Sequence, residues 1–295
     1  MITLLQLDYF RRLAASEHIT ATAKELFISQ TALSSMIISL ERELGVQLFD
    51  RSRRSIRLNA AGRTYLGYVN QVFAALDNGL AAIKDLEDTR EQQVSMAVGS
   101  SLVWMPMLHA FRTRYPDTVP KQSNLSVEKL NLALEEMTVD YVIAGSDDIT
   151  ANGLLSSHIK NDGVYLVVPE NHPLAARDSV SLDEIKDESF ISLPVGTPWR
   201  SFCDRLFEKA GLSIHNSVEC DYTMRAPLIA SGFGVALTSS TAKSVDLLKP
   251  NRYIRVDDPS AVRDMCLFWN PGRYMSRAAL IFKDFCIDFY KDAEL

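Results

Sequence analysis

Two short helices and a basic hairpin are predicted between residues 20 and 58, and this pattern constrains the fold more than any other feature. In the first helix, apolar residues recur at helical spacing: Ala23, Leu26 and Phe27. Ser29 offers a hydroxyl cap for the second helix, and Gly45 can adopt the left-handed conformation that ends it. The order of these elements predicts a helix-turn-helix with a wing.

The second helix is predicted to have one apolar face and one polar face. Its apolar residues are spaced by four, three and four positions: Leu33, Ile37, Leu40 and Leu44. Short hydrogen-bonding groups at the N-terminal end of a helix can reach base edges in the major groove. We therefore expect DNA contacts from four residues: Gln30, Thr31, Ser34 and Ser35.

The predicted hairpin after Gly45 is cationic. It has four arginines between residues 51 and 57 and no acidic residue among them. Such a hairpin suits contact with phosphates or with the minor groove, so Arg51, Arg53 and Arg54 are further candidates for DNA contact. The plainer alternative is that a charge run is a solvated surface and that the two helices are only a core unit. The combination, in this order and spacing, favours DNA binding.

The charge distribution agrees with a small DNA-binding region. Residues 1–58 contain eight Lys or Arg and six Asp or Glu, whereas the remaining residues contain 23 basic and 31 acidic ones. The chain as a whole has a net charge of −6. Because the acidic remainder should be repelled by DNA, we expect contact to be confined to the N-terminal region.

The composition is that of an ordinary globular protein, with 47% hydrophobic and 23% charged residues. No apolar run approaches a membrane span, and no secretory signal precedes the first amphipathic helix, so a cytoplasmic location without membrane partners is expected. Cys203, Cys220, Cys266 and Cys286 form no CxxC pair and no metal-ligand spacing with histidine. Buried reduced thiols are therefore expected, with no metal and no catalytic residues.

A long helix is predicted over residues 61–88, which contain no proline. Its apolar residues alternate steps of four and three, interrupted only by a glycine: Tyr65, Val69, Val72, Leu76, Gly79, Ile83 and Leu86. Such a seam favours a helix that packs against a second copy of the chain, rather than a helix that packs only within its own chain. At 1.5 Å per residue the helix spans roughly 42 Å, enough to hold two DNA-binding heads at successive major grooves.

After a polar hinge at 89–93, strands and helices alternate. Strands are predicted at 94–99, 139–144, 165–168, 189–193, 234–238 and 265–269. Helices are predicted at 105–114, 127–137, 199–210, 224–231 and 277–290. This alternation predicts an α/β architecture with a parallel sheet, which would bind ligands at the carboxyl ends of its strands.

Over essentially its full length the chain resembles the LysR-type transcriptional regulators. The specific part of the resemblance is SQTALSSMIISLERELGVQLFDR at 29–51, supported by RSIRLNAAG, YLVVPENHPLA and LIASGFGVAL further along. It implies a winged helix-turn-helix at 1–58, a dimerising linker helix at 59–89 and an effector-binding region at 90–295. That region is expected to have two α/β subdomains, about 90–163 with 268–295 and about 164–267, like those of periplasmic solute-binding proteins.

The resemblance also implies partners: double-stranded DNA, further copies of the chain in a homodimer or homotetramer, a small-molecule effector and, as a candidate, RNA polymerase. Two departures stand out. Relatives often carry basic residues where this chain has Ser35, Ile38 and Ser39, which should make its DNA affinity less dependent on salt. Ser239 replaces the proline usual after the GVAL strand.

By resemblance, the effector lies between the subdomains. The matching segments contain six candidate residues: Ser100, Ser101, Ser126, Thr197, Trp199 and Arg200. Hydroxyl groups and backbone N–H groups at helix N-termini suit an anion, to which Arg200 would add a charged donor and Trp199 an aromatic wall. The alternative is that Ser100 and Thr197 are helix caps and no more.

Three other classes of protein are alternatives to a regulator. An enzyme has little support, because GxSxG, phosphate-loop, HExxH and complete dinucleotide-turn motifs are missing from the sequence. A solute transporter would need a signal peptide and no DNA-binding head. A peroxide-sensing regulator remains open: such relatives have a cysteine pair after residue 196, whereas here Cys203 has its nearest partner at Cys220.

Overall fold

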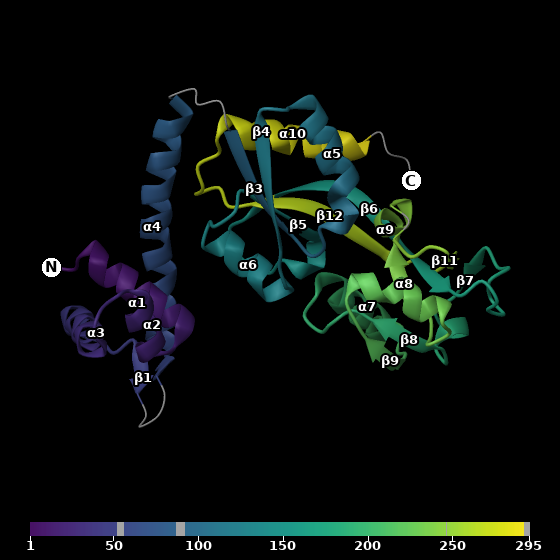
Figure 1. Ribbon diagram of the computed structural model, residues 1–295, viewed down its shortest axis with the longest axis horizontal. Helices are drawn as coiled ribbons and strands as arrows, with labels where there is room; N and C mark the ends of the chain where they lie inside the picture. The colour runs from purple at the N-terminus through teal and green to yellow at the C-terminus, as the bar shows by residue number, and fades with distance from the viewer. Residues whose placement is uncertain (52–55, 87–91, 246, 292–295) are drawn as a thin grey trace. The chain divides into compact units, whose positions relative to one another are not determined.

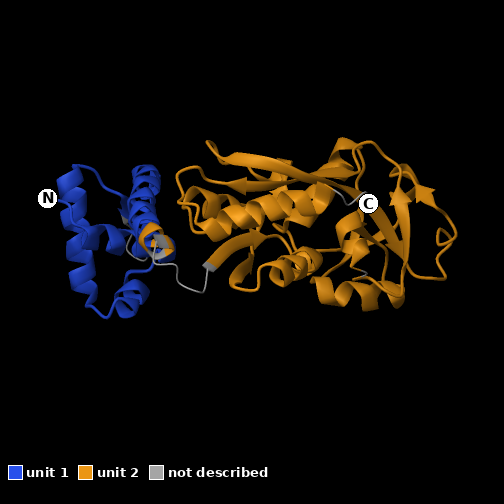
Figure 2. Ribbon diagram, turned by 90° about the horizontal axis from the view of Figure 1, so that it is seen from above, with its two compact units in different colours: residues 1–80 blue, residues 81–295 orange. Residues whose placement is uncertain are grey.

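The computed structural model describes residues 1–51, 56–86, 92–245 and 247–291. Contacts divide the chain into two compact units, Met1–Leu80 and Ala81–Leu295 (Figure 2). The domain boundaries predicted above, at residues 58 and 89, stay predictions, because the helix between them contributes to both units. Within the described ranges, no helix is long and apolar enough to cross a membrane.

The first unit contains the predicted helix-turn-helix and wing (Figure 1). Its elements are α1 (Leu4–Ser16), α2 (Ile19–Glu25), α3 (Gln30–Leu44), β1 (Phe49–Arg51) and β2 (Ile56–Leu58), followed by α4 (Ala60–Leu86). The predicted helix cap is confirmed: the Ser29 hydroxyl accepts a hydrogen bond from the Ala32 backbone N–H at 3.1 Å. The predicted helix end is confirmed too, since Gly45 has a φ of 71°.

The long helix α4 has two different halves. Its first turns pack into the core of the head, where Val69 is 1% exposed and Tyr65 and Phe73 are partly buried. A Cβ on Gly62 would clash with the Leu48 carbonyl oxygen, so only glycine permits this close approach. The predicted seam is therefore mixed: Tyr65 and Val69 belong to the core of their own chain, whereas Val72, Leu76 and Ile83 are exposed. The side chain of Leu86, the last predicted seam residue, lies outside the described part of the chain.

The second unit alternates strands and helices over its whole length. Its helices are α5 (Met105–Arg114), α6 (Val127–Glu135), α7 (Pro198–Lys209), α8 (Tyr222–Ala230), α9 (Ser240–Ser244) and α10 (Arg277–Lys291), with short 3-10 turns η1 (Leu102–Trp104), η2 (Ser146–Asp148) and η3 (Asp183–Ile185). Its strands are β3 (Gln92–Val98), β4 (Thr118–Asn124), β5 (Tyr141–Gly145), β6 (Leu155–Val168), β7 (Ser179–Val180), β8 (Ser189–Ser192), β9 (His215–Glu219), β10 (Ala236–Ser239), β11 (Arg252–Val256) and β12 (Val262–Trp269).

The main sheet of this unit is mixed rather than purely parallel. Its order is β4-β3-β5-β12-β6-β11-β7, and β10 also pairs with β6. Strand β3 is parallel to both β4 and β5, as predicted, but β12 is antiparallel to β5 and β6. The expectation of a parallel sheet was therefore wrong for the long strands β6 and β12.

Those two long strands connect the two halves of the unit. The first part of β6 pairs with β12 up to Gly163, and from Val164 onward it pairs with β10 and β11. One continuous strand thus serves two hydrophobic cores. In one half, the part of the sheet formed by β4, β3 and β5 is covered by α5 and α10 on one face and by α6 on the other (Figure 1). The core of the other half is formed largely by β6, β8, β10 and α7.

Successive side chains of a strand point to opposite faces of the sheet, so one strand contributes to the packing on both faces. In β3, Val94, Met96 and Val98 pack toward α5 and α10, whereas Ala97 packs toward α6. The predicted strands and helices of this unit are all found. Sequence patterns missed β4, β7, β9, β11 and the first ten residues of β6. Strand β4 lies at the sheet edge, where its Pro120 and polar residues are tolerated.

Candidate functional site

The N-terminal end of α3 presents polar side chains above a buried apolar stripe. Leu33, Ile37 and Leu40 are at most 1% exposed, so the opposite face of the helix is fixed outward. Of the predicted DNA contacts, Gln30, Thr31 and Ser35 are exposed and Ser34 is half-buried. The Thr31 hydroxyl lies 2.9 Å from that of Ser29, which ties it to the cap of the helix. This face is accessible to a groove of DNA.

The wing is a two-stranded antiparallel hairpin, as predicted. Strand β1 pairs with β2 in a register that places Asp50 opposite Arg57. Arg53 and Arg54 lie outside the described residues, and for Arg51 only the backbone, in β1, is described. Arg57 donates to the Glu17 carboxylate at 2.6 Å, so this fourth arginine already has an acidic partner in α1's cap.

Two glutamates fasten the wing to the helices, and sequence patterns did not single out either one. The Glu41 side chain is buried and accepts hydrogen bonds from the backbone N–H groups of Leu48 at 2.9 Å and Phe49 at 3.3 Å. Glu17 accepts from the Leu58 N–H at 2.8 Å. That bond, together with Arg57, lowers the pKa of Glu17. The wing is therefore held by both α1 and α3.

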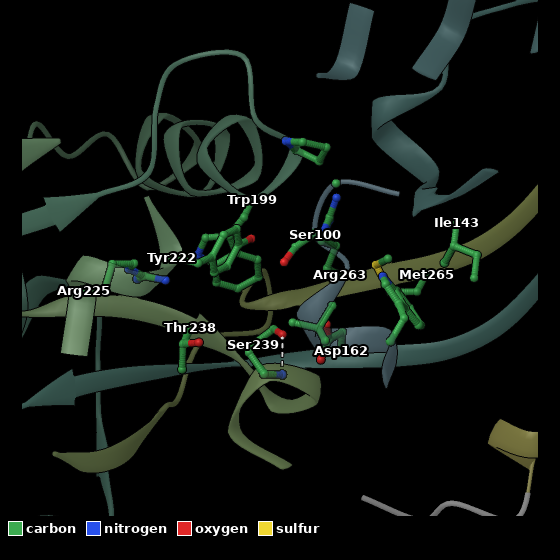
Figure 3. A pocket seen from close by; sticks show the side chains of 15 residues that line it. Ser100, Ile143, Asp162, Trp199, Tyr222, Arg225, Thr238, Ser239, Arg263 and Met265 are labelled. Atoms are coloured by element: carbon green, nitrogen blue, oxygen red, sulfur yellow. Dashed lines mark hydrogen bonds between the residues drawn. The ribbon is translucent and has the colours of Figure 1, made fainter. Parts of the chain in front are cut away.

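In the second unit, a small cavity lies beyond the carboxyl end of β3. Its volume is about 40 Å³, and its lining comes from β3's end, α7, α8, β10 and β12 (Figure 3). Two of the six predicted effector residues line it: Ser100, which is 7% exposed, and Trp199, also 7% exposed. A Cβ on Gly99 would lie 2.7 Å from Cγ of Pro198, so glycine lets these two predicted segments meet.

Two other predicted effector residues, Ser101 and Ser126, do not line this cavity. The Ser101 hydroxyl donates to Asn124 Oδ1 at 2.6 Å. Ser126 caps α6 by accepting from the Lys129 N–H at 3.4 Å, and it borders a separate, open surface hollow. These serines hold neighbouring loops in place.

Thr197 and Arg200 also have partners away from the cavity. The Thr197 hydroxyl donates to the Pro194 carbonyl at 2.8 Å and does not cap α7. Arg200 Nε donates to both carboxylate oxygens of Asp204, at 2.7 and 2.9 Å, and Nη1 donates to the Leu193 carbonyl. Arg200 thus has an acidic partner on its own helix, and the cations that face the cavity are different residues.

Those cations are Arg225 on α8 and Arg263 on β12, neither of which was predicted. Arg225 is 2% exposed, and its Nη2 donates to the Leu237 carbonyl. The same carbonyl accepts from Trp199 Nε1 at 3.0 Å. Burial lowers the pKa of Arg225 and raises that of its neighbour Tyr222. A signal for Arg225 did exist, because it is the one charged residue in the apolar segment 224–230.

Arg263 belongs to a buried ion-pair cluster. Its Nη2 donates to Oδ2 of Asp148, whose side chain is fully buried, and Arg205 of α7 donates to Oδ1 at 2.8 Å. The Gly145 N–H donates to the same carboxylate at 3.2 Å. Because Asp148 follows β5 and Arg205 lies on α7, the cluster joins the two halves of the unit. No local sequence pattern predicts it.

Asp162 and Ser239 are two further polar residues that line the cavity. Asp162 Oδ1 accepts three hydrogen bonds, from the hydroxyls of Ser240 and Thr241 and from the Thr241 N–H, at 2.7 to 2.9 Å. Ser239 lines the cavity and caps α9 by accepting from the Ala242 N–H. Its hydroxyl thus supplies a helix cap that a proline at this position would lack.

The sequence comparisons agree with this architecture. Residues 4–63 match the family "Bacterial regulatory helix-turn-helix protein, lysR family", and residues 88–291 match "LysR substrate binding domain". The chain belongs to the LysR family. It is a DNA-binding transcriptional regulator with an effector-binding domain, and not an enzyme.

Two curated relatives of this LysR-family regulator come from Bacillus subtilis (strain 168). The HTH-type transcriptional regulator YybE is 33% identical over 97% of this chain and 99% of its own length. The transcriptional dual regulator GltC is 27% identical over 99% of this chain and 98% of its own length. Among solved structures, a full-length cysteine variant of OxyR from Pseudomonas aeruginosa has a TM-score of 0.69 at 22% identity, covering 97% of this chain and 95% of that one. This similarity shows a shared fold.

The cysteines of this LysR-family regulator do not have the environment of reactive thiols. All four are free, and Cys203, Cys266 and Cys286 are buried. Burial raises the pKa of Cys203 to about 12 and also raises the pKa of the half-exposed Cys220. Since the thiolate is the reactive form, these environments oppose a peroxide-sensing role for the pair.

Proposed function

We propose that this LysR-family regulator recognises its operator with the N-terminal half of α3 and with the wing. The observation that carries the proposal is the polar face of α3, where Gln30, Thr31 and Ser35 are exposed and Ser34 is half-buried, opposite the buried Leu33, Ile37 and Leu40. The α3 hydroxyl and amide groups would read base edges, and Arg51, Arg53 and Arg54 would contact phosphates or the minor groove. Arg57 would contribute less, because Glu17 already pairs with it.

The effector would bind in the cavity beside Ser100 and Trp199. Both residues line it, and it lies where the two halves of the unit meet. We propose that binding shifts the angle between these halves and that the assembly then re-spaces its DNA-binding heads. Ser101, Ser126, Thr197 and Arg200 would act on the effector only indirectly, through the loops they hold. An unchanged DNase footprint and bend angle on effector addition would contradict this mechanism.

Fluorescence anisotropy with DNA from upstream of the chain's own gene tests the operator proposal. Measured at two salt concentrations against scrambled competitor, binding should prefer the native sequence and should weaken as salt rises. Binding without any sequence preference, to both upstream DNA and a selected pool of random sites, would contradict recognition by α3. The assay also provides a readout for screening effectors.

We further propose that two copies associate through the second half of α4 and that dimers form a tetramer. The support is an exposed apolar stripe on one face of that helix: Tyr68, Val72, Leu76, Leu80 and Ile83 are 40–63% exposed. Exposed apolar residues at this spacing are typical of a helix that packs against another copy. DNA and RNA polymerase would meet this assembly in the cytoplasm.

The substitution Leu76→Glu tests this association, because it places a charge in the middle of the stripe. Light scattering should show smaller assemblies than for the unmodified chain, and DNA affinity should fall by roughly tenfold or more as the second head is lost. Gln71→Glu, which adds the same charge at an exposed position of α4, is the matched control and should leave the assembly intact. Equal effects of the two substitutions would contradict a role for the stripe.

A further inference from the structure

Arg225 is a buried cation for which no carboxylate partner is found in the described part of the chain. It is 2% exposed, and its Nη2 donates to a backbone carbonyl, that of Leu237. Its Nε has no hydrogen-bond acceptor among those residues. A buried guanidinium without a counter-charge is strongly unfavourable, so its retention calls for an anion that the protein itself does not supply.

Arg205 and Arg263, in contrast to Arg225, each have a carboxylate partner. Both donate to the fully buried carboxylate of Asp148, so two positive charges share one negative charge. Arg263 also has a spare donor, because its Nε has no acceptor within the described ranges, and it lines the same cavity as Arg225. Two guanidinium groups with unused N–H donors therefore border one cavity (Figure 3).

We infer that the effector is a small monocarboxylate whose oxygens accept hydrogen bonds from Arg225 and Arg263 in this cavity. This inference rests on the proposed function, in which the same cavity holds the effector. A carboxylate suits the planar fork of a guanidinium, and binding would supply the missing counter-charge. Ser100 adds a hydroxyl on the opposite segment of the lining.

The size and the rest of the lining restrict the ligand further. A cavity of about 40 Å³ has room for about three water-sized groups, which corresponds to a carboxylate with a short chain. Trp199, Tyr222 and Met265 provide an apolar wall for that chain. Asp162 lines the same cavity, and its charge opposes a second negative charge on the ligand. A dianion such as sulfate or phosphate is therefore a poor fit.

Calorimetric titration of the full-length protein at constant ionic strength tests this inference. The probes are sodium acetate, propionate and pyruvate, compared with acetamide, propionamide and pyruvamide as their neutral analogues and with sulfate and phosphate as inorganic anions. At least one carboxylate should bind saturably, and its neutral analogue and both inorganic anions should bind roughly tenfold more weakly or not at all. Saturable binding by none of the three carboxylates overturns the inference, as does equal binding of an amide or of sulfate.

Substitutions then assign the site. Arg225→Met, which removes the charge but keeps much of the side-chain length, should weaken carboxylate binding by roughly tenfold or more. Arg225→Lys keeps the charge but loses the fork, and it provides the same test if the Met variant does not fold. Arg255→Met, at an exposed arginine of the same unit, is the control and should bind as the unmodified chain does. Unchanged affinity in both Arg225 variants overturns the assignment.

The inference and the proposed function fail in different ways. Operator binding by the unmodified chain is measured by anisotropy without any carboxylate. If that binding is sequence-specific while the carboxylates do not bind, the effector class is wrong and operator recognition by α3 stands.

Discussion

The DNA-binding head and the effector-binding unit use polar residues in opposite ways. In the head, an apolar core made by α1, α3 and α4 supports polar side chains that face outward, such as Gln30 and Ser35. In the effector-binding unit, the charged groups Asp148, Arg225 and Arg263 are themselves inside. A functional side chain of the head can therefore be changed with little loss of stability. In the other unit, the arginines that we propose to bind the effector are buried, so changing them should also affect stability.

The position of the tryptophans allows this comparison to be tested separately in each unit. Trp104, Trp199 and Trp269 all lie in the effector-binding unit, so tryptophan fluorescence reports the unfolding of that unit alone. Far-ultraviolet circular dichroism also reports the helices of the head. A transition seen by dichroism but not by fluorescence is therefore assigned to the head.

The largest effect is expected for Asp148→Ala. Removing this carboxylate leaves the buried Arg263 and the half-buried Arg205 without their counter-charge, which should lower the free energy of unfolding by about 3–5 kcal/mol. Urea denaturation followed by tryptophan fluorescence measures the loss. The neighbouring Asp147 is exposed, so Asp147→Ala should change the stability by less than about 0.5 kcal/mol. Similar losses in the two variants would show that the buried ion pairs of Asp148 contribute no more to stability than an exposed carboxylate does.

A smaller effect, confined to the head, is expected for Glu41→Gln. The amide replaces a carboxylate that accepts from Leu48 and Phe49, which should lower the stability of the head by about 1–3 kcal/mol. The dichroism transition should shift to lower urea while the tryptophan transition stays in place. Glu25→Gln, at an exposed ion pair with Arg12, is the control, with an expected change below about 1 kcal/mol. A shift of the tryptophan transition would mean that the two units unfold together.

Changes on the outward face of the head should alter DNA binding and leave stability nearly unchanged. Arg53→Ala, at a position outside the described residues, should weaken binding to specific and random DNA alike and reduce the salt slope by about one. Ser34→Ala should instead change the preference among sites by about 1 kcal/mol or less. Anisotropy on both kinds of DNA distinguishes them. Equal changes in the specificity ratio would contradict the division into phosphate and base contacts.

The smallest effect is expected from thiol modification. Because burial raises the pKa of Cys203 to about 12, almost none of this thiol is ionised at pH 8, and iodoacetamide should react first with the half-exposed Cys220. Mass spectrometry of the folded chain gives the order of labelling, and anisotropy should show unchanged DNA binding. A peroxide-dependent change in DNA binding, with a disulfide between Cys203 and Cys220, would restore the redox alternative.

The head could be predicted from the sequence more completely than the cavity that we propose for the effector. In the head, the cap at Ser29, the stripe through Leu33 and Leu40 and the end at Gly45 are all local signals, and each was found. Of the six predicted effector residues, Ser100 and Trp199 line the cavity, and both lie in segments with local signals: one follows a strand and the other begins a helix. Arg200 was predicted because it lies near a helix start, yet Asp204, one turn later, pairs with it, and Arg225, which lines the cavity, was not predicted.

The sequence by itself thus determined the order of the elements, the orientation of α3 and two walls of the cavity, since helix caps, periodicity and strand ends depend on neighbouring residues. Tertiary structure alone decided which charges meet. Asp148 and Arg263 are 115 positions apart and come together because β6 and β12 carry the chain between the two halves of the unit. Pairing over such a distance depends on strand register and on the burial of both partners, and no local pattern in the sequence records either one.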